Sequence, residues 1–419
     1  MRVLWICNIV IPSFSDEFSI KKTVFGGWME SMLNLLEKKE VEISLAFPIY
    51  DPSRKHDGSY NNHNYYAFDG MMDDKSYCDS FQNEFVRIFK IECPDVVHIW
   101  GTEYNHTRAA VEAAVELNII NRILIDTQGL CGKISNHYAT GIPSTVLHED
   151  YSEGKKISEE ICEFREKGVN ERISVGLVKN IVGRADWDRA ICCQINPKIN
   201  YSISYRVLRE GFYNCSGSWD LNNCDQHSIF ICDGSYPVKG FHIFLDAFSI
   251  IKKSYSDAVC YIAGRNPMKA DRDGRISQYG NYIKQLIKEK NLENDIIFCQ
   301  ECSEKEMIKR YLSANVFVAA SVIESNCNAL TEAMLIGVPS VASFVGGMME
   351  QIEHKKNGYL YQADAPYMLA YYVSEIFGND KLAMQFSKNG FASARERCDR
   401  DMNIKNLMKT YNAIYSSNR

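Results

Sequence analysis

The first stretch of the chain alternates between a fully apolar segment and a segment with helical spacing. Residues 3–11, VLWICNIVI, form a continuous apolar and β-branched run of strand length. Such a run is typical of a parallel strand that is buried on both faces. After Gly26 and Gly27, an apolar stripe with the spacing i, i+3, i+4 and i+7 is formed by Met29, Met32, Leu33 and Leu36. The chain is therefore predicted to begin as strand, glycine turn and helix.

The same alternation continues through both halves of the sequence. Further strands are predicted over 41–48, 95–101 and 122–129, with a helix over 109–117. A second series begins near Ser228, with SIFICDG, AVCYIAG and DIIFCQ as strands and HIFLDAFSIIKK and YIKQLIKEK as helices. This order predicts the α/β class, with two doubly wound parallel sheets.

Two polar stretches interrupt the alternation. The stretch NCSGSWDLNNCD at 214–225 separates the two halves and suits a hinge. We therefore expect a first domain over 1–210, a second over 226–400 and a C-terminal helix over 401–419. Residues 50–80 are rich in Asp, Asn, Tyr and Ser, which predicts an insertion or a long mobile loop.

Composition and charge restrict the class of protein. Hydrophobic residues make up 46% and charged residues 24% of the 419 residues, as in an ordinary globular chain. The formal net charge of −6 argues against a generally basic nucleic-acid binder, so we expect no nucleic-acid partner. Acidic and basic residues alternate over 150–175, which predicts a solvated helix face. No apolar run approaches the roughly 18 residues that a membrane helix needs, and Pro12 favours a buried first strand over a signal peptide.

The fifteen cysteines show no regular spacing and fall within predicted strands and helices, as at Cys7, Cys232 and Cys260. We interpret them as reduced core thiols of a cytosolic protein. The close pair Cys299 and Cys302 lacks the second pair that a structural zinc site requires.

The segment 320–347, ASVIESNCNALTEAMLIGVPSVASFVGG, holds the densest set of chemical groups. Glu324 follows directly after an apolar strand, and ALTEAMLI is predicted to be a short helix. The unpaired donors at the start of this helix would be the backbone N–H groups around Asn328, Ala329 and Leu330. Because the helix dipole adds to these donors, the sequence predicts an anion site there. Glu332, placed in the first helical turn, could accept paired hydrogen bonds from sugar hydroxyl groups.

The order of these features resembles the signature of the retaining glycosyltransferases of family 4. Glu324 is followed after seven residues by Glu332, then by AM, a Gly-Val-Pro turn and the pair Gly346 and Gly347. The resemblance implies the GT-B fold, in which two Rossmann-like domains face a central cleft and the C-terminal helix, here 401–419, crosses back to the N-terminal domain. It also implies that Glu332 binds the ribose hydroxyls of a nucleotide-sugar and that Glu324 lies against the transferred hexose.

A second stretch, DGSYPVKGFHIFLDAF at 233–248, resembles the first strand-to-helix turn of that family's C-terminal domain. The resemblance gives Lys239 a contact with the diphosphate, and the alternative is an ordinary surface lysine. Ser235 stands where relatives often carry an arginine. Arg265, in the later turn AGRNP, could supply that missing cation or could be a mere surface arginine.

The N-terminal half shows weaker matches to the same family. Gly26 and Gly27 match its glycine-rich loop, where the backbone can approach phosphate or sugar. The stretch HIWGTEYNH at 98–106 resembles a strand end that helps to form the sugar and acceptor cleft. His98 and Glu103 are therefore candidate lining residues, although His98 could instead be a buried core histidine.

Two further positions concern the acceptor side. Gln128, in DTQGL, occupies the place where many relatives have a histidine before glycine. Its neutral amide can bond a sugar hydroxyl but cannot carry a proton, which excludes a general acid or base at this position. Arg184 and Asp188 stand where the N-terminal domain ends, and they either face the cleft or brace the hinge.

Two Asp-x-Asp triplets, 271–273 and 399–401, have the spacing with which another glycosyltransferase fold holds a metal on the diphosphate. Each lies among polar residues in a predicted loop or exposed helix, and neither ends a buried strand. We therefore expect no catalytic metal and no cofactor beyond the nucleotide-sugar co-substrate.

The resemblance implies a retaining, metal-independent glycosyltransferase that moves a hexose from a nucleotide diphosphate donor, by default a UDP-sugar, to a glycan or lipid-linked saccharide. No enzyme nucleophile is found, which favours same-face attack with the leaving phosphate oxygen taking the acceptor's proton. SYPVKGFH and ADAPYMLAYYVSEIF look like bacterial members that build surface polysaccharides. That likeness suggests a cytoplasmic protein with peripheral contact at the inner face of the membrane. The alternatives are a noncatalytic GT-B partner protein and a nucleotide-sugar epimerase, which Gln128 disfavours.

Overall fold

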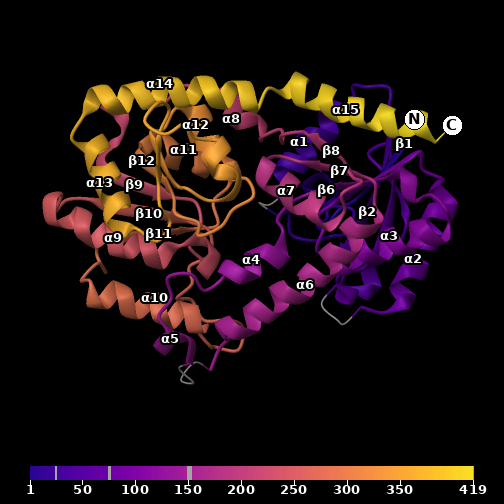
Figure 1. Ribbon diagram of the computed structural model, residues 1–419, viewed down its shortest axis with the longest axis horizontal. Helices are drawn as coiled ribbons and strands as arrows, with labels where there is room; N and C mark the ends of the chain where they lie inside the picture. Colours follow the sequence, from indigo (N-terminus) through magenta and orange to yellow (C-terminus); the bar gives the residue numbers. More distant parts are fainter. Residues whose placement is uncertain (24–25, 74–76, 149–152, 419) are drawn as a thin grey trace. The chain divides into compact units, whose positions relative to one another are not determined.

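The computed structural model describes residues 1–23, 26–73, 77–148 and 153–418, and the chain divides into two compact units (Figure 1). Unit 1 comprises Met1–Lys133, Phe164–Val207 and Asp399–Arg419, and unit 2 comprises Ile134–Glu163 and Leu208–Cys398. Residues 134–163, which the sequence assigns to a first domain over 1–210, thus group with unit 2. Arg419, the last residue of the predicted C-terminal helix, lies outside the described residues.

Unit 1 is built on an eight-stranded sheet in the order β3-β4-β2-β1-β5-β6-β7-β8. The strands are β1 (Arg2–Ile6), β2 (Glu42–Ile49), β3 (Gly58–Tyr60), β4 (His63–Asp69), β5 (Val96–Trp100), β6 (Ile123–Asp126), β7 (Asn180–Gly183) and β8 (Asn200–Ile203). All neighbours are parallel except β3 and β4. β1 pairs with β2 on one side and β5 on the other, so the switch point lies between β1 and β5. The loops that follow these strands carry Gly26 and Glu103.

The helices of unit 1 are α1 (Gly27–Leu36), α2 (Asp79–Glu92), α3 (Asn105–Glu116), α7 (Asp186–Ile195) and α15 (Arg400–Ser417). Two more helices, α4 (Cys131–His137) and α6 (Ile157–Leu177), each contain a boundary between the units. Helix α1 buries the apolar stripe predicted from the sequence, Met29, Met32, Leu33 and Leu36.

Residues 50–80, predicted to be an insertion or a long mobile loop, contain β3 and β4, so the mobile-loop alternative is wrong for 58–69, and 74–76 lie outside the described residues. β4 pairs in parallel with β2 and buries Tyr65 and Tyr66. Their hydroxyl groups donate hydrogen bonds to Glu17 and Glu92, each at 2.7 Å. Tyrosine rings whose hydroxyls are satisfied can fill a core, so the polar composition of this stretch concealed a buried strand.

Unit 2 is built on a six-stranded, fully parallel sheet in the order β11-β10-β9-β12-β13-β14. The strands are β9 (Asp225–Ile231), β10 (Val259–Ala263), β11 (Ile296–Gln300), β12 (Ala314–Ala319), β13 (Ser340–Ser343) and β14 (Tyr359–Tyr361). β9 pairs with β10 on one side and β12 on the other, which places the switch point between β9 and β12. Ligands of open α/β sheets bind at such points, beyond the carboxyl ends of the strands. The loops that meet there carry Lys239 and Glu324.

The helices of unit 2 are α5 (Ser144–His148), α8 (Glu210–Asn214), α9 (Phe241–Ser254), α10 (Gln278–Glu289), α11 (Glu304–Ser313), α12 (Asn328–Ile336), α13 (Pro366–Phe377) and α14 (Asp380–Arg397). Short 3-10 helices are η1 (Pro12–Phe14), η2 (Pro52–Arg54), η3 (Gly70–Met72), η4 (Ile120–Arg122), η5 (Leu221–Asn223), η6 (Pro237–Lys239) and η7 (Gly346–Glu350). None of the helices in the described ranges combines the length and apolar character needed to span a bilayer.

Two glycines allow close backbone contacts at the carboxyl end of the unit 2 sheet. Gly240 has a φ of 67°, and a Cβ there would lie 2.0 Å from the Ala320 carbonyl oxygen. Gly346 has a φ of 50°, and a Cβ there would lie 1.9 Å from the Glu324 carbonyl oxygen. The Gly347 N–H donates to that same oxygen at 3.0 Å. A side chain at Gly240 or Gly346 would therefore push these loops apart.

Helix α15 is joined to the sheet of unit 1 by one tyrosine. Tyr411 is fully buried, and its hydroxyl oxygen accepts a hydrogen bond from Trp5 Nε1 at 3.0 Å. The same hydroxyl lies 2.6 Å from His98 Nδ1. Burial, with the nearby Arg206 charge, lowers the pKa of His98 to about 3, so the ring is neutral and accepts the Tyr411 proton at Nδ1. One phenol thus connects α15 with both β1 and β5.

The Gly346→Ala variant is expected to lose stability, because the added methyl group would meet the Glu324 carbonyl oxygen. A left-handed backbone costs a non-glycine residue roughly 1–2 kcal/mol, and overpacking adds about 1–3 kcal/mol. Gly274→Ala is the matched control, because Gly274 has a φ of 80° and an added Cβ would meet no described atom within 4 Å. Chemical denaturation should show the larger loss for Gly346→Ala, and equal losses would contradict the steric argument.

The Tyr411→Phe variant is expected to destabilise the chain by about 1–3 kcal/mol, because it leaves Trp5 Nε1 and His98 Nδ1 buried without their partner. Tyr367→Phe removes the same hydroxyl from a side chain that is 63% exposed, and it should change little. Urea unfolding of both variants measures the difference. A Tyr411→Phe loss no greater than that of the control would show that the phenol hydroxyl contributes nothing to stability.

Candidate functional site

The loops after β9 and β12 bring a lysine and a glutamate together. Lys239 ends η6, and Glu324 lies between β12 and α12. Lys239 Nζ donates to Glu324 Oε2 at 2.8 Å, and the two side chains are 22% and 17% exposed. The structure thus unites the two residues that the sequence predicts to be catalytic.

Lys239 retains its positive charge although it is largely buried. Burial alone would lower the pKa of its ammonium group, but the carboxylate of Glu324, with Tyr236 and Asp233, raises that pKa well above its usual value. The ammonium nitrogen also lies 5.6 Å from the centre of the Tyr236 ring, which favours the cation. A permanently charged ammonium group at a sheet crevice can bind a phosphate oxygen.

Helix α12 begins beside Glu324 with no side-chain cap. Its first turn contains the three positions predicted as anion donors, Asn328, Ala329 and Leu330. The residue before the helix, Cys327, is held by Gln351, whose Oε1 accepts from the Cys327 N–H at 3.0 Å and whose Nε2 donates to the Cys327 carbonyl at 2.9 Å. Gln351 therefore fixes the helix start, a function that no sequence pattern indicated.

Glu332 lies in the second turn of α12, and its predicted place in the first turn is wrong. Its side chain is buried, with Oε1 accepting from Arg209 at 3.1 Å and Oε2 accepting from the Tyr311 hydroxyl at 3.2 Å. Burial raises the pKa of Glu332, whereas the Arg209 charge lowers it. Sequence reasoning missed Arg209 and Tyr311, because neither belongs to a motif and both are distant from Glu332 along the chain.

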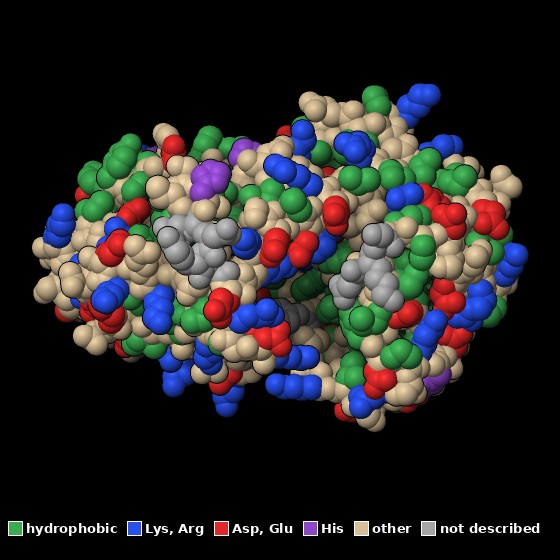
Figure 2. Space-filling model, turned by 90° about the horizontal axis from the view of Figure 1, so that it is seen from below, with side chains coloured by type: hydrophobic (Ala, Val, Ile, Leu, Met, Phe, Trp, Pro, Cys, Tyr) green, Lys and Arg blue, Asp and Glu red, His purple; other side chains and the backbone are tan. Residues whose placement is uncertain are grey.

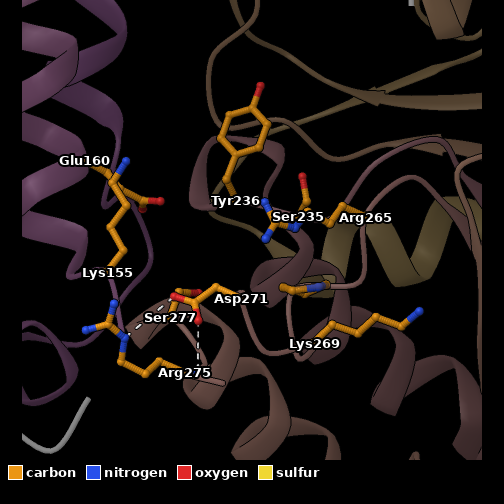
Figure 3. A pocket seen from close by; sticks show the side chains of 10 residues that line it. Lys155, Glu160, Ser235, Tyr236, Arg265, Lys269, Asp271, Arg275 and Ser277 are labelled. Atoms are coloured by element: carbon orange, nitrogen blue, oxygen red, sulfur yellow. Dashed lines mark hydrogen bonds and ion pairs between the residues drawn. The ribbon is translucent and has the colours of Figure 1, made fainter. Parts of the chain in front are cut away.

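Ser235 and Arg265 line the same cavity of unit 2, which has a volume of about 330 Å³ (Figure 3). The other lining residues are Lys155, Glu160, Tyr236, Pro267, Lys269, Asp271, Arg275 and Ser277. The Ser235 N–H donates to Asp233 Oδ1 at 2.9 Å, which holds the turn after β9. The structure thus brings Arg265 near Ser235, and a donor-binding role for either residue stays a prediction.

Gly26 and Gly27 form the start of α1 in unit 1. Gly26 has a φ of 78°, and a Cβ there would lie 2.3 Å from Ile9 Cδ1, so the turn requires glycine. Gly27 is the first residue of the helix. Because neither residue has a side chain, a ligand can approach their backbone closely at the switch point of the unit 1 sheet. Their contact with a donor stays a prediction.

Two candidate residues of the sugar and acceptor cleft, each with a structural alternative, are packed inside unit 1. His98 is fully buried against Tyr411, as a core histidine. Arg184 is 1% exposed, and its guanidinium donates to the carbonyl oxygens of Thr127 at 2.5 Å and Gln128 at 3.2 Å. The geometry thus favours the structural alternative for both: His98 packs in the core, and Arg184 braces the loop after β6.

Asp188 completes this brace. It accepts hydrogen bonds from the Thr127 hydroxyl at 2.8 Å and from the Arg184 N–H at 2.9 Å. The backbone at Gln128 is therefore held in place, while its side-chain Nε2 is buried with no hydrogen-bond partner among the described residues. A buried amide donor of this kind can be satisfied by a ligand hydroxyl.

Glu103 lies next to a second buried carboxyl group, Glu171 on α6. The Thr102 hydroxyl is 3.3 Å from Glu103 Oε2 and 3.5 Å from Glu171 Oε2. Burial, with the Glu103 charge, raises the pKa of Glu171 to about 8, and burial also raises the pKa of Glu103. The sequence missed Glu171, because it lies in the charged stretch interpreted as a solvated helix face.

The two Asp-x-Asp triplets support local structure. Asp271 accepts from the N–H groups of Asp273 and Arg275, both at 2.9 Å, and Asp399 caps α15 by accepting from the Met402 N–H at 2.7 Å. Across the described ranges, no three His, Cys, Asp or Glu side chains gather in a way that could hold a metal ion. That a reaction at this site needs no metal stays a prediction.

The segment that carries the candidate site of unit 2 matches a known family of proteins. Residues 225–393, which include both Lys239 and Glu324, match the family model described as glycosyl transferases group 1. An uncharacterized glycosyltransferase of Methanocaldococcus jannaschii is 22% identical over 330 residues, covering 77% of this chain and 76% of that protein.

Solved structures share the fold over the whole chain. A sucrose-phosphate synthase from Thermosynechococcus elongatus has a TM-score of 0.73 at 13% identity, covering 100% of both chains. Anabaena HepE in complex with UDP and glucose has a TM-score of 0.66 at 15% identity, covering 99% of this chain and 100% of that one. Residues 225–393 thus resemble the group 1 glycosyl transferase domain, and the two parallel-sheet, Rossmann-like units have the GT-B fold of these solved structures.

Proposed function

We propose that this protein is a retaining hexosyltransferase. It takes the sugar from a nucleotide diphosphate donor, a UDP-sugar in the first instance, and transfers it to a hydroxyl group of a glycan or lipid-linked saccharide. The observation that carries the proposal is the Lys239–Glu324 contact of 2.8 Å beside the uncapped start of α12, within the matched domain. The complex of Anabaena HepE with UDP and glucose supports UDP as the nucleotide part of the donor.

The departing diphosphate needs positive charge that is in place before the bond breaks. Lys239 supplies an ammonium group, and the first-turn N–H groups of α12 supply dipoles on the adjacent loop. In the proposed reaction the bond between the anomeric carbon and the phosphate oxygen breaks while the acceptor oxygen attacks from the same face. The acceptor's proton passes to the phosphate oxygen, and Glu324 orients the hexose.

Glu332 can bind the ribose while it remains paired with protein groups. Each of its oxygens accepts one hydrogen bond in the structure, from Arg209 or from Tyr311. A carboxylate has about four acceptor sites, so both oxygens can still accept from neighbouring hydroxyls. Gln128 and Glu103 remain the candidates for binding the acceptor. His98 and Arg184 are buried, and the Arg184 guanidinium already donates to a backbone carbonyl oxygen.

Lys239→Ala and Glu324→Ala are each expected to lower turnover, on the order of 10²- to 10³-fold, because each removes one preorganised charge. The matched controls are Lys356→Ala and Glu353→Ala, which break an ion pair of the same 2.8 Å length whose side chains are 65% and 64% exposed. UDP release from a panel of UDP-sugars, with and without saccharide acceptors, measures turnover. Turnover within twofold of the parent in both site variants would refute the assignment, and a parent that releases no UDP would favour a noncatalytic partner protein.

Removal of divalent metal is expected to leave turnover unchanged, because Lys239 and the α12 amides can compensate the charge of the diphosphate. Initial rates are measured in metal-free buffer with and without EDTA, and again after magnesium is restored. A loss on EDTA that magnesium reverses would contradict metal independence.

A further inference from the structure

The cavity lined by Ser235 and Arg265 carries more positive than negative charge. Four of its lining side chains are cationic and two are carboxylates, listed here together: Lys155, Arg265, Lys269, Arg275, Glu160 and Asp271. The donor's diphosphate already has Lys239 and the α12 amides, and Lys239 does not line this cavity. The cavity therefore holds a second concentration of positive charge within the same unit.

The four cations differ in how closely carboxylates neutralise them. Lys155 pairs with Glu163 at 2.6 Å, and Arg275 pairs with Asp273. Within the described ranges neither Arg265 nor Lys269 forms such a close ion pair, although the Arg265 charge helps to lower the pKa of Asp271, after the larger effect of the backbone hydrogen bond from Arg275. Figure 3 shows the Arg265 guanidinium pointing into the cavity beside Ser235 and Tyr236, whereas Lys269 extends away from it. Arg265 thus directs into the cavity a cation that no close ion pair neutralises.

The walls of the cavity are held together by a buried glutamine. Gln278, at the start of α10, donates from its backbone N–H to the Lys155 carbonyl at 3.0 Å. Its side chain accepts from the Ile157 N–H at 2.9 Å and donates to the Val146 carbonyl at 2.6 Å. These bonds join the segment that carries Lys155 to the start of α10, both within unit 2. The wall that bears Lys155 is therefore attached to the wall that bears Ser277.

The surface seen in Figure 2 has no extended region of one sign: Lys and Arg side chains are interspersed there with Asp and Glu side chains. The net charge of the chain is −6. A cavity with an excess of cations on such a surface favours one compact anionic group over a long polyanion.

We propose that this cavity binds the phosphate group of a phosphorylated acceptor, with Arg265 as its main ligand. The inference rests on the proposed transferase function and names its acceptor class. Tyr236 lines the cavity and also lies 5.6 Å from Lys239 Nζ, so a phosphate bound there is close to the reacting centre. Arg265 then serves the acceptor and does not replace the donor-binding arginine absent at Ser235. A sugar phosphate and a saccharide linked to lipid through diphosphate both present this group.

The first experiment titrates inorganic phosphate into the full chain saturated with UDP, and follows the thermal midpoint and the heat of binding. Phosphate is expected to bind without displacing UDP. Arg265→Ala should weaken phosphate binding at least tenfold, and Arg265→Lys should restore part of it. Lys284→Ala, which removes an exposed cation of α10 outside the cavity, is the matched control and should bind like the parent.

Three results would overturn the inference: no phosphate binding, binding unchanged in Arg265→Ala, or competition between phosphate and UDP. Competition would indicate that Arg265 binds the diphosphate of the donor. Stabilisation of the parent by UDP alone tests the proposed function separately, because its absence would refute donor binding whatever phosphate does.

The second experiment identifies the source of the phosphate group. Glucose 6-phosphate and farnesyl diphosphate are compared as competitors of bound phosphate, with glucose as the uncharged control. Stronger competition by glucose 6-phosphate supports a soluble sugar phosphate as acceptor, and stronger competition by farnesyl diphosphate supports a lipid-linked one. If neither competes better than glucose, the cavity does not serve a phosphorylated acceptor.

Discussion

The contact between the Gly346 backbone and the Glu324 carbonyl oxygen is the constraint on which the site in unit 2 depends. Glu324 follows a strand whose hydrogen bonds end at Ala319, so the sheet itself does not position its side chain. The Gly346 backbone packs against the Glu324 carbonyl oxygen, which also accepts a hydrogen bond from the Gly347 N–H. Gly240 packs in the same way against the Ala320 carbonyl oxygen. With both loops held in this way, the Lys239–Glu324 ion pair forms without the entropy cost of ordering two free loops. The glycines of the motif thus determine the backbone packing, and this packing brings the charged side chains of Lys239 and Glu324 together.

The order of the strands determines where this packing occurs. In each unit the first strand, β1 or β9, is central, and the strands that follow it fill first one edge and then the other. The carboxyl ends of two neighbouring strands then face loops that leave in opposite directions, and a crevice opens between them. Unit 1 has Gly26 and Glu103 after its two switch strands, and unit 2 has Lys239 and Glu324. The same strand order accordingly places different side chains at the switch point of each unit.

The sequence predicted the features that depend on neighbours along the chain. The alternation of strands and helices, the α1 stripe and the fold class are confirmed, because periodicity reports which face of an element is buried. The pairing of Lys239 with Glu324 was accessible only through a family resemblance, since 84 residues separate them. Arg209, Tyr311 and Gln351 were missed, because isolated polar residues show no period and their partners are fixed by tertiary packing. β4 was missed for a related reason: tyrosines count as polar until their hydroxyls find acceptors.

The charges of the site also explain why its carboxylates can act differently. Glu324 lies at the crevice and shares its charge with Lys239, an ammonium that a phosphate could also engage. Glu332 is more deeply placed and is held by the planar guanidinium of Arg209 together with the Tyr311 hydroxyl. Burial raises the pKa of Glu332, and the Arg209 charge together with the hydrogen bonds from Arg209 and Tyr311 opposes that rise. Glu332, which we propose binds the ribose hydroxyls, is thus held by two protein groups, and Glu324, which we propose orients the hexose, is paired with a cation on a separate loop.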